Sequence, residues 1–218
     1  MSGGLSTEAA DAVYAEFAAL GTATVHEAFG RGGLVDLPLI QVVPGSRAAG
    51  PARTVRCAQG DNLMVHAVMA ATEPGDVLVL TMPQPEPIAL LGELLATQAK
   101  VRGAAAVLID AAVRDVEELA GLGLPIWARY VRVRGAEKAV PGAIDEPVEV
   151  GGVTIRPGDV VVLDADGAVV VPSGRVEEVL GAARARAERE REKRAKLEAG
   201  GLSYDLDGLR ERVEGRGR

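Results

Sequence analysis

The sequence has almost no cysteine, few aromatic residues and no long hydrophobic run. Cys57 is the single cysteine in 218 residues, which excludes an intrachain disulfide, and one thiol cannot build a zinc–thiolate site. Aromatic residues make up 3% of a chain that is 48% hydrophobic, so Val, Leu, Ala and Ile must build the core. No apolar run approaches the roughly 20 residues of a membrane helix, and no signal-like segment is present. A soluble cytoplasmic protein is therefore expected.

Basic clusters are also missing. The formal net charge is −7, and only the mixed C-terminal tail gathers basic residues. Because phosphate binding relies on clustered Lys and Arg, nucleic acid is not expected as the main partner. The length suffices for one domain with a sizeable core, and the aliphatic composition suits a tightly packed α/β protein.

The middle of the chain predicts a βαβ unit. Residues 77–80 and 104–109 are apolar runs typical of buried strands, and a proline-rich loop and a helix beginning after Gly92 lie between them. The two strands are therefore expected to be parallel, with a right-handed crossover. In open α/β sheets ligands bind beyond the carboxyl ends of the strands, where Gly92 and the pair Arg114-Asp115 are expected to lie.

These residues have the chemistry of an anion site. Gly92 lets the backbone approach a ligand closely, and the first N–H groups of the helix that follows favour a carboxylate or phosphate. Arg114 offers a cation and Asp115 a hard oxygen ligand, a combination that suits a small α-keto acid. The spacing alone is equally compatible with a structural reading, in which Arg114 and Asp115 cap the next helix and pair with surface charges.

Periodicity and turn residues predict the remaining elements. Helices are expected over residues 5–19, 25–29, 63–71, 116–122 and 175–198, with Ser6 or Thr7 as a cap for the first. Strands are expected over residues 39–43, 52–57, 125–133, 148–155 and 160–171, the last with a hairpin turn at residues 164–167. Similar Pro-Gly-Asp turns at residues 74–76 and 157–159 suggest two related β units.

Several polar residues have a structural and a functional interpretation. Asp61 or Asn62 is the expected N-cap of the helix at 63–71, and a simple cap is the favoured role of Asp61. His26, next to an aromatic residue, is expected to be packed and hydrogen-bonded rather than functional. The role of His66 stays open. The acidic pair in the turn at 164–167 lacks the other ligands of a calcium loop and is interpreted as a turn.

The last helix has a thin apolar face. Beyond Ala187 only Ala195 and Leu197 are apolar, so burial in its own subunit cannot be what mainly holds it. Either it is a solvated helix with many ion pairs, or it lies across a neighbouring subunit.

One known family combines these features at the same spacing. The run Gly-Glu-Leu-Leu-Ala-Thr-Gln-Ala starts at Gly92, and 20 residues separate Glu93 from Arg114-Asp115. This resembles the acidic-x20-Arg-Asp signature of the class II aldolases of 4-hydroxy-4-methyl-2-oxoglutarate (HMG) and 4-carboxy-4-hydroxy-2-oxoadipate (CHA). The regulator of ribonuclease E activity A, which is not an aldolase, shares their fold. Other matching segments are residues 22–28, 49–55, 60–62 with His66, 74–79 and 203–206.

The resemblance implies an architecture. It is an α/β fold of the β/β/α swivelling type, with a central β-core flanked by helices and an extended C-terminal helix. Residues 1–174 would form the catalytic domain, and residues 175–218 a helix and tail that reach a neighbouring subunit. The implied assembly is a homotrimer or a homohexamer (a dimer of trimers), with active sites between subunits.

The resemblance also implies a divalent-metal mechanism that releases pyruvate from a 4-hydroxy-2-oxo acid and decarboxylates oxaloacetate as a side activity. Asp115 would be the direct ligand of Mg²⁺ or Mn²⁺, whereas Glu93 and a neighbour's Glu192 (or else Glu188) would hold metal-bound waters. Arg114 would contact the keto oxygen, and a metal-bound water would be the base. The implied site for the substrate's C1 carboxylate is the N–H groups of Glu93, Leu94 and Leu95. A Schiff-base mechanism is not expected, because Lys100 lies two turns down its helix.

Two departures from the family pattern bear on the substrate. Glu93 replaces a frequent Asp, and Leu91 stands where several relatives carry Trp. The competing interpretations are a non-catalytic protein inhibitor resembling the regulator of ribonuclease E, and a related lyase acting on another 2-oxo acid. The extended tail and the Arg114-Asp115 pair favour the aldolase, but the sequence does not identify the distal group of the substrate.

Overall fold

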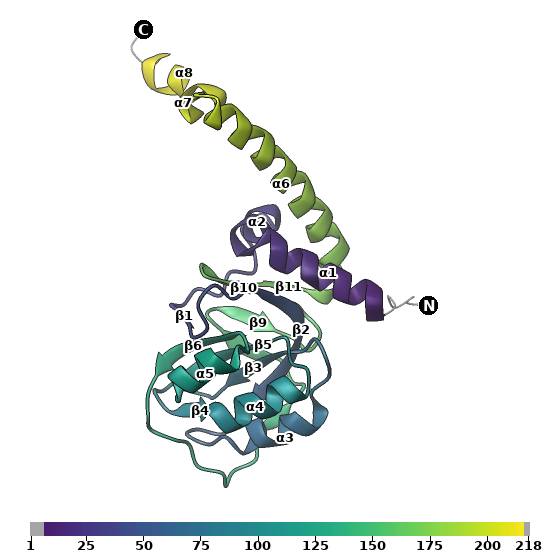
Figure 1. Cartoon of the computed structure of the whole chain (residues 1–218), viewed down its shortest axis with the longest axis vertical. Coiled ribbons are helices and arrows are strands. Elements are labelled where there is room, and N and C mark those ends of the chain that lie inside the picture. Colours follow the sequence, from purple (N-terminus) through teal and green to yellow (C-terminus); the bar gives the residue numbers. More distant parts are fainter. Residues whose placement is uncertain (1–6, 216–218) are drawn as a thin grey trace.

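The computed structural model describes residues 7–215, so the predicted contributions of Leu5 and Ser6 lie outside the described residues. A curled mixed sheet forms the centre of the molecule (Figure 1). Its strands follow the order β1 (Ile40–Gln41), β6 (Ile126–Val131), β5 (Ala106–Val113), β3 (Val77–Thr81), β2 (Ala48–Arg56), β10 (Val160–Asp164) and β11 (Gly167–Val171). Off this path lie β4 (Ala89–Leu91), paired with β5, and β7 (Ala143–Ile144), paired with β2. A separate hairpin consists of β8 (Val148–Val150) and β9 (Val153–Ile155).

The centre of the sheet is parallel and its edges are antiparallel. Strands β2, β3, β5 and β6 run parallel to one another. At the edges, β10 pairs antiparallel with β2 and with β11, and β1 pairs antiparallel with β6. The parallel pairing of β3 with β5 confirms the predicted βαβ unit. Every residue of β3 and β5 is buried, as expected for a parallel sheet covered on both faces.

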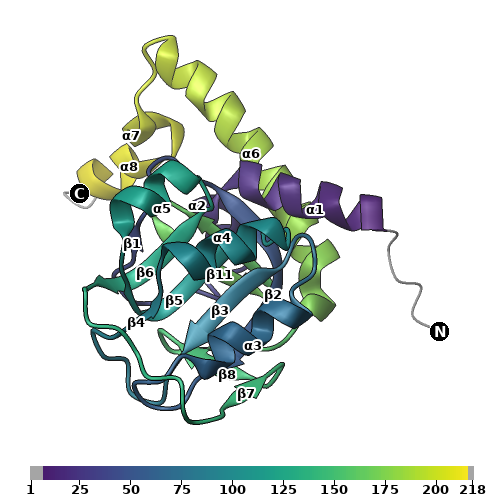
Figure 2. The same ribbon diagram turned by 60° about the horizontal axis from the view of Figure 1, so that its bottom comes forward.

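Helices cover one face of this sheet. They are α3 (Leu63–Ala71), α4 (Glu93–Val101) and α5 (Val116–Leu122), which lie in front of the strands in Figure 2. Leu78 and Leu80 of β3 pack toward these helices, and the alternate residues Val77 and Val79 pack toward the β8–β9 hairpin. Since neighbouring strand residues point to opposite faces, one strand thus contributes to two cores.

A second group of helices packs on the β10–β11 hairpin. They are α1 (Thr7–Leu20), α2 (Thr22–Ala28) and the start of α6 (Val176–Glu198), which follows a short 3-10 helix, η1 (Ser173–Arg175). Phe17, Val25 and Val179 form a third core cluster with the hairpin valines. Asp164 fixes the start of α2, because its carboxylate accepts hydrogen bonds from the N–H and hydroxyl of Thr22 at 2.8 and 2.6 Å. The acidic turn is therefore a hairpin that also caps a distant helix.

The two Pro-Gly-Asp turns have the same local geometry. Asp76 accepts the N–H of Glu73 at 2.8 Å, and Asp159 accepts the N–H of Arg156 at 2.9 Å. The strands that follow, β3 and β10, flank β2 on its two sides. The suggested relation between the two units holds for these turns, although one strand pairs parallel and the other antiparallel with β2.

Several predicted strand boundaries were wrong; for example, the strand expected over residues 52–57 begins at Ala48. The strand expected to end at residue 109 continues to Val113, because the side chain of Asp110, buried in the sheet, is paired with Arg129 at 2.9 Å. The single strand expected over residues 148–155 is a hairpin, since Gly151 and Gly152 both adopt positive φ and reverse the chain.

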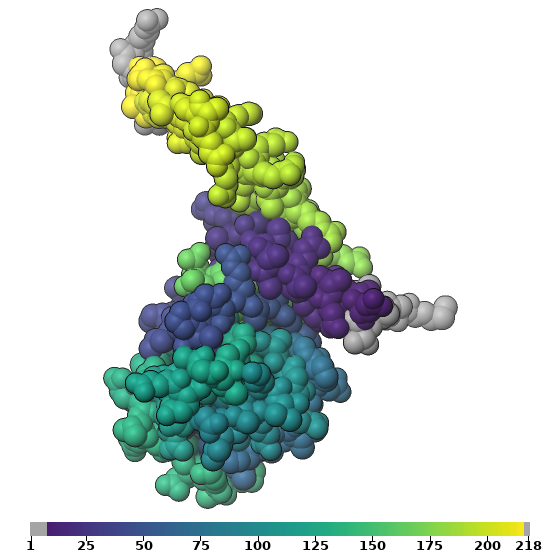
Figure 3. Space-filling view, in the orientation of Figure 1, coloured from purple at the N-terminus to yellow at the C-terminus, as the bar shows by residue number. Residues whose placement is uncertain are grey.

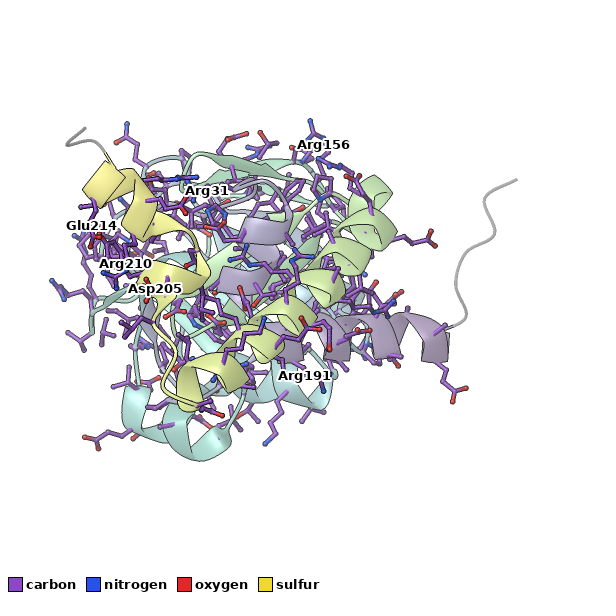
Figure 4. The ribbon with its side chains drawn as sticks, turned by 90° about the horizontal axis from the view of Figure 1, so that it is seen from above. Arg31, Arg156, Arg191, Asp205, Arg210 and Glu214 are labelled. Atoms are coloured by element: carbon purple, nitrogen blue, oxygen red, sulfur yellow. The ribbon has the colours of Figure 1, made fainter. Side chains whose placement is uncertain are left out.

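The C-terminal part projects from the body, as Figures 1 and 3 show. Val179, Leu180 and Ala183 are the buried residues of α6, and they all lie in its first half. Two short helices, α7 (Ser203–Leu206) and α8 (Leu209–Glu214), follow it. Arg210 of α8 forms ion pairs with Asp205 of α7 and with Glu214 of its own helix (Figure 4). Within the described residues, no helix is both long and apolar enough to cross a membrane.

Candidate functional site

The site begins where β4 leads into α4. Strand β4 pairs with the last residues of β5, and Gly92 is the N-cap of α4 in an extended conformation. The first turn of α4 therefore opens at the carboxyl edge of the parallel strands. The N–H groups of such a turn have no intrahelical acceptors and favour an anion.

Arg114 and Asp115 follow the end of β5 and lie beside this turn. Oδ2 of Asp115 accepts the N–H of Glu93 at 3.0 Å and lies 3.6 Å from Nε of Arg114. Asp115 is the N-cap residue of α5, but its side chain makes no capping hydrogen bond to that helix. The carboxylate thus turns to α4, which argues against the structural interpretation of Asp115 as a simple cap for α5.

Asp115 adopts a left-handed backbone conformation. Its φ is 61° and its ψ is 42°. Residues with a Cβ rarely occupy this region, although Asp tolerates it better than most. Such outliers cluster at functional sites, where the surrounding structure holds them in place. Here the conformation directs the carboxylate back across the loop to α4.

Two glycines leave room for the Arg114 side chain. A Cβ built on Gly92 would lie 2.5 Å from Oδ2 of Asp115 and 3.0 Å from Nε of Arg114. A Cβ on Gly135 would lie 2.9 Å from Nη1 of Arg114. The guanidinium therefore lies between two backbone segments that approach it more closely than any side chain would allow.

The start of α3 supplies another wall. Asn62 donates from Nδ2 to the carbonyl of Leu90 at 3.0 Å, which fixes the orientation of its carboxamide. Its Oδ1 is buried and has no hydrogen-bond partner among the described residues. His66 lies one turn further along α3. Because a buried, unsatisfied acceptor costs about 1–3 kcal/mol, a donor from a bound molecule would stabilise this wall.

These segments enclose a cavity of about 230 Å³. It is lined by Asn62, His66, Ala89, Leu91, Gly92, Leu94, Leu95, Arg114, Asp115, Gly135, Ala136 and Lys138. Among the described residues that line it, Arg114 and Lys138 are the cations and Asp115 is the one acidic residue. The cavity therefore suits a small molecule with more than one negative charge.

The sequence-predicted residues divide into those that line the cavity and those that do not. Gly92, Leu94, Leu95, Arg114 and Asp115 line it. Glu93 does not, because its side chain accepts the hydroxyl of Thr97 at 3.0 Å. The backbone N–H of Glu93, which was expected to bind the substrate, donates a hydrogen bond to Asp115 instead.

The residues predicted to reach the site from the last helix do not line the cavity of their own chain. Glu192 is exposed on the projecting half of α6, and Glu188 pairs with Arg191 at 2.6 Å. Within the part of the chain that the structure describes, no cluster of three or more His, Cys, Asp or Glu residues could hold a metal ion.

The two histidines differ in position. Nδ1 of His26 lies 3.0 Å from the carbonyl oxygen of Gly32, in agreement with the predicted packed role, whereas His66 lines the cavity.

Sequence reasoning missed the segment that carries Gly135, Ala136 and Lys138. Lys100, the lysine weighed for a Schiff base, donates to the carbonyl of Leu122, whereas Lys138 lines the cavity. No periodic pattern marks this segment. Its run of charged residues beside a glycine was the one available signal.

Comparisons with known proteins agree on one family. The model of the RraA-like family, described as Aldolase/RraA, matches residues 22–170. A protein of Halalkalibacterium halodurans, provisionally named 4-hydroxy-4-methyl-2-oxoglutarate aldolase, is 41% identical over 134 residues. That match covers 62% of this chain and 64% of the relative, so it spans less than two thirds of the relative's length.

Solved structures show the same fold. A protein of Pseudomonas syringae described as uncharacterized matches with a TM-score of 0.78 and 28% identity, over 88% of this chain and 91% of that one. RraAS2 of Streptomyces coelicolor, described as an unusual member of the RNase ES inhibitor RraA family, matches with a TM-score of 0.76 and 29% identity. The latter match covers 89% of this chain and 99% of that chain, and the two likenesses confirm the predicted α/β fold.

Proposed function

The chain belongs to the RraA-like family of aldolases and RraA proteins, and we propose that it is a divalent-metal-dependent aldolase that cleaves a 4-hydroxy-2-oxo acid to release pyruvate. The observation that carries the proposal is the meeting of Arg114, Asp115 and the open first turn of α4 in one cavity. An RNase inhibitor that acts by protein contact does not need this arrangement. A location in the cytoplasm is part of the same proposal.

The residues present fit a metal that keeps most of its water. Mg²⁺ is commonly held by one or two carboxylates together with waters and substrate oxygens, so a single carboxylate in the cavity is compatible with it or with Mn²⁺. Oδ2 of Asp115 is engaged with α4, which leaves Oδ1 for the ion. When bound, the ion would supply Lewis acidity toward the 2-keto oxygen.

The chain's own groups would bind and orient the substrate. Leu94 and Leu95 would offer their N–H groups to the C1 carboxylate, since Glu93 gives its own to Asp115. Arg114 would stabilise the charge that develops on the keto oxygen as the C3–C4 bond breaks, and removal of one such donor costs about 2.7–4 kcal/mol in other enzymes. The cavity's second cation, Lys138, would attract a distal carboxylate, as in HMG and CHA. Glu93 would act at a distance, through water.

A second copy of the chain would complete the site. Of the described residues of one chain, Asp115 is the acidic one that lines the cavity, and α6 projects away from it (Figure 1). Apolar side chains of the tail are exposed and lack cover, namely Leu197, Leu202, Leu206, Leu209 and Val213. We therefore propose a homotrimer or a dimer of trimers in which residues 175–218 of one subunit bring Glu192, or else Glu188, to a neighbour's site.

Pyruvate release, coupled to lactate dehydrogenase, tests the proposal. HMG and oxaloacetate would be supplied in turn, with Mg²⁺ or Mn²⁺ and then with EDTA. We expect metal-dependent pyruvate from both. Pyruvate from oxaloacetate alone would indicate a related decarboxylase, and EDTA-resistant turnover that borohydride abolishes would indicate a Schiff base on Lys138.

Inhibition of a ribonuclease is the second candidate function. It is favoured by the likeness to RraAS2 along nearly that whole chain. No pyruvate from either substrate, together with inhibition of purified RNase E or RNase ES, would favour it over the aldolase.

A further inference from the structure

Asp61 has more partners than a helix cap needs. It is 2% exposed, and both of its carboxylate oxygens are used. Oδ1 accepts the N–H of Leu63 at 2.7 Å, which is the capping contact for α3. Oδ2 accepts the N–H groups of Ala139 and Val140, at 2.6 and 3.0 Å, from a segment 78 and 79 residues away. The predicted role as a helix cap thus accounts for one of the three hydrogen bonds that Asp61 accepts.

The distant segment is the missed wall of the cavity. We call residues 134–140 the strap. Backbone hydrogen bonds anchor its first half, residues 134–137: the carbonyl of Arg134 accepts the N–H of Ala89 at 2.7 Å. Glu137 exchanges two further bonds with residues 60 and 62, both at 2.9 Å. Beyond Glu137, the hydrogen bonds that join the strap to the rest of the described chain are those to the Asp61 carboxylate.

The strap carries two groups that shape the cavity. Gly135 faces the guanidinium of Arg114, and Lys138 contributes the second cation. Lys138 directly precedes the two residues that Asp61 holds. A shift of the strap's C-terminal half would therefore move Lys138 relative to His66 of α3 and to Asn62, the N-cap residue of that helix.

Asp61 is held as a carboxylate. Burial would raise its pKa, but the three backbone N–H groups and the nearby charge of Lys138 outweigh burial and leave the pKa below its ordinary value. A charged acceptor makes stronger hydrogen bonds than a neutral one, so the contact is well suited to fix a loop.

We propose that Asp61 is a positioning residue that fastens the strap to the start of α3 and so sets the place of Lys138 in the cavity. The proposal rests on the proposed function, because the cavity must bind a substrate for this position to matter. Asp61 itself would touch neither substrate nor metal. Its effect would reach the ligand through Lys138.

Asp159 provides a matched control. It is also buried, and its two oxygens accept backbone N–H groups, from Ser173 and Arg156, both at 2.9 Å. None of these residues lines the cavity. Asp61→Asn and Asp159→Asn each replace an acceptor oxygen by a donor NH₂ and should both lower the melting temperature. A purely structural role of Asp61 would make the two variants alike in every readout.

Kinetics separate the two roles. For Asp61→Asn we expect the KM for HMG to rise roughly 10- to 100-fold, with a smaller change in kcat, because a misplaced binding group costs binding first. For Asp159→Asn we expect both constants to stay within about twofold, since neither Asp159 nor the residues that it holds line the cavity. An unchanged KM in folded Asp61→Asn, or an equal rise in Asp159→Asn, would overturn the proposal.

Amide hydrogen exchange tests the hydrogen bonds between Asp61 and the strap without any assay of turnover. In the wild-type chain the N–H groups of Ala139 and Val140 should be protected although both residues are exposed, and Asp61→Asn should release them. Unprotected amides in the wild-type chain would overturn the proposal even if the variant fails to fold. If the wild type released no pyruvate while these amides were protected, the proposed function would fail and the fastening would stand.

Discussion

Gly92→Ala is the most informative single change, because it alters shape without altering charge or backbone conformation. The φ of Gly92 is −138°, an extended value that alanine adopts freely. The added Cβ would lie 2.5 Å from Oδ2 of Asp115, whereas ordinary contacts begin at 3.4 Å. The carboxylate must therefore retreat by about 0.9 Å, and Nε of Arg114, at 3.0 Å, must also yield.

These displacements should lower activity far more than stability. Arg114 and Asp115 are about half exposed, so they can move into solvent at little cost. Loss of a glycine N-cap costs at most about 1 kcal/mol. A misplacement of about 1 Å at a reacting centre, however, can cost about 100-fold in rate, which is about 2.7 kcal/mol of activation free energy.

The assay is kcat/KM for pyruvate release from HMG, with urea unfolding in parallel. Gly121→Ala is the matched control: Gly121 lies within α5, no atom lies within 4 Å of its ideal Cβ, and its φ is not positive. That variant should gain about 0.5–1 kcal/mol of stability and keep full activity. Full activity in Gly92→Ala would refute the reasoning that links Gly92 to the placement of Arg114 and Asp115.

Three further predictions follow from the same structure. Arg114→Lys should lower kcat roughly 100- to 1,000-fold because an ammonium cannot reproduce the guanidinium geometry, and near-normal turnover would contradict the role given to Arg114. Because the folded pKa of Asp61 is depressed, its contribution to stability is present above the unfolded pKa and is lost as the pH falls through the folded value. In acid titrations followed by circular dichroism, Asp61→Asn should therefore lose less stability between neutral and acidic pH than the wild type, and parallel curves would be contrary to this expectation. Trp127→Ala should cost about 3–5 kcal/mol in urea unfolding, since the side chain is 1% exposed and donates from Nε1 to the carbonyl of Asp164 at 2.8 Å.

The sequence predicted those features that depend on local pattern. Continuous valine and leucine runs predicted β3, β5 and the β10–β11 hairpin, because strands buried on both faces must be apolar at every position. The order of strand, helix and strand then placed Gly92 and Arg114-Asp115 at the same edge of the sheet. That inference needed only the rule that parallel strands end together.

The missed features depend on contacts between distant segments. Lys138 and Gly135 belong to a loop without periodicity, and its position is set by hydrogen bonds to residues that lie far earlier in the chain, from Ala89 back to Asp61 and Gly60. The N–H of Glu93 was assigned to a substrate because its actual acceptor, Asp115, lies 22 residues further along the chain. Local pattern cannot reveal such pairs, so the outline of the site was predictable but not its full lining.

The backbone at Asp115 separates the functional from the structural interpretation of the Arg-Asp pair. A left-handed residue with a Cβ is disfavoured by about 1–2 kcal/mol relative to the right-handed form, and glycine at this position would avoid that cost. If the pair served only to start α5, a residue that caps α5 with its side chain would suffice, yet Asp115 makes no such bond. Its carboxylate instead faces the N–H of Glu93 and the guanidinium of Arg114, at the edge of a cavity that holds a second cation. Under the proposed function, the strained backbone serves to place a carboxylate between α4 and the cavity, and the gain from that placement would lie in binding rather than in folding.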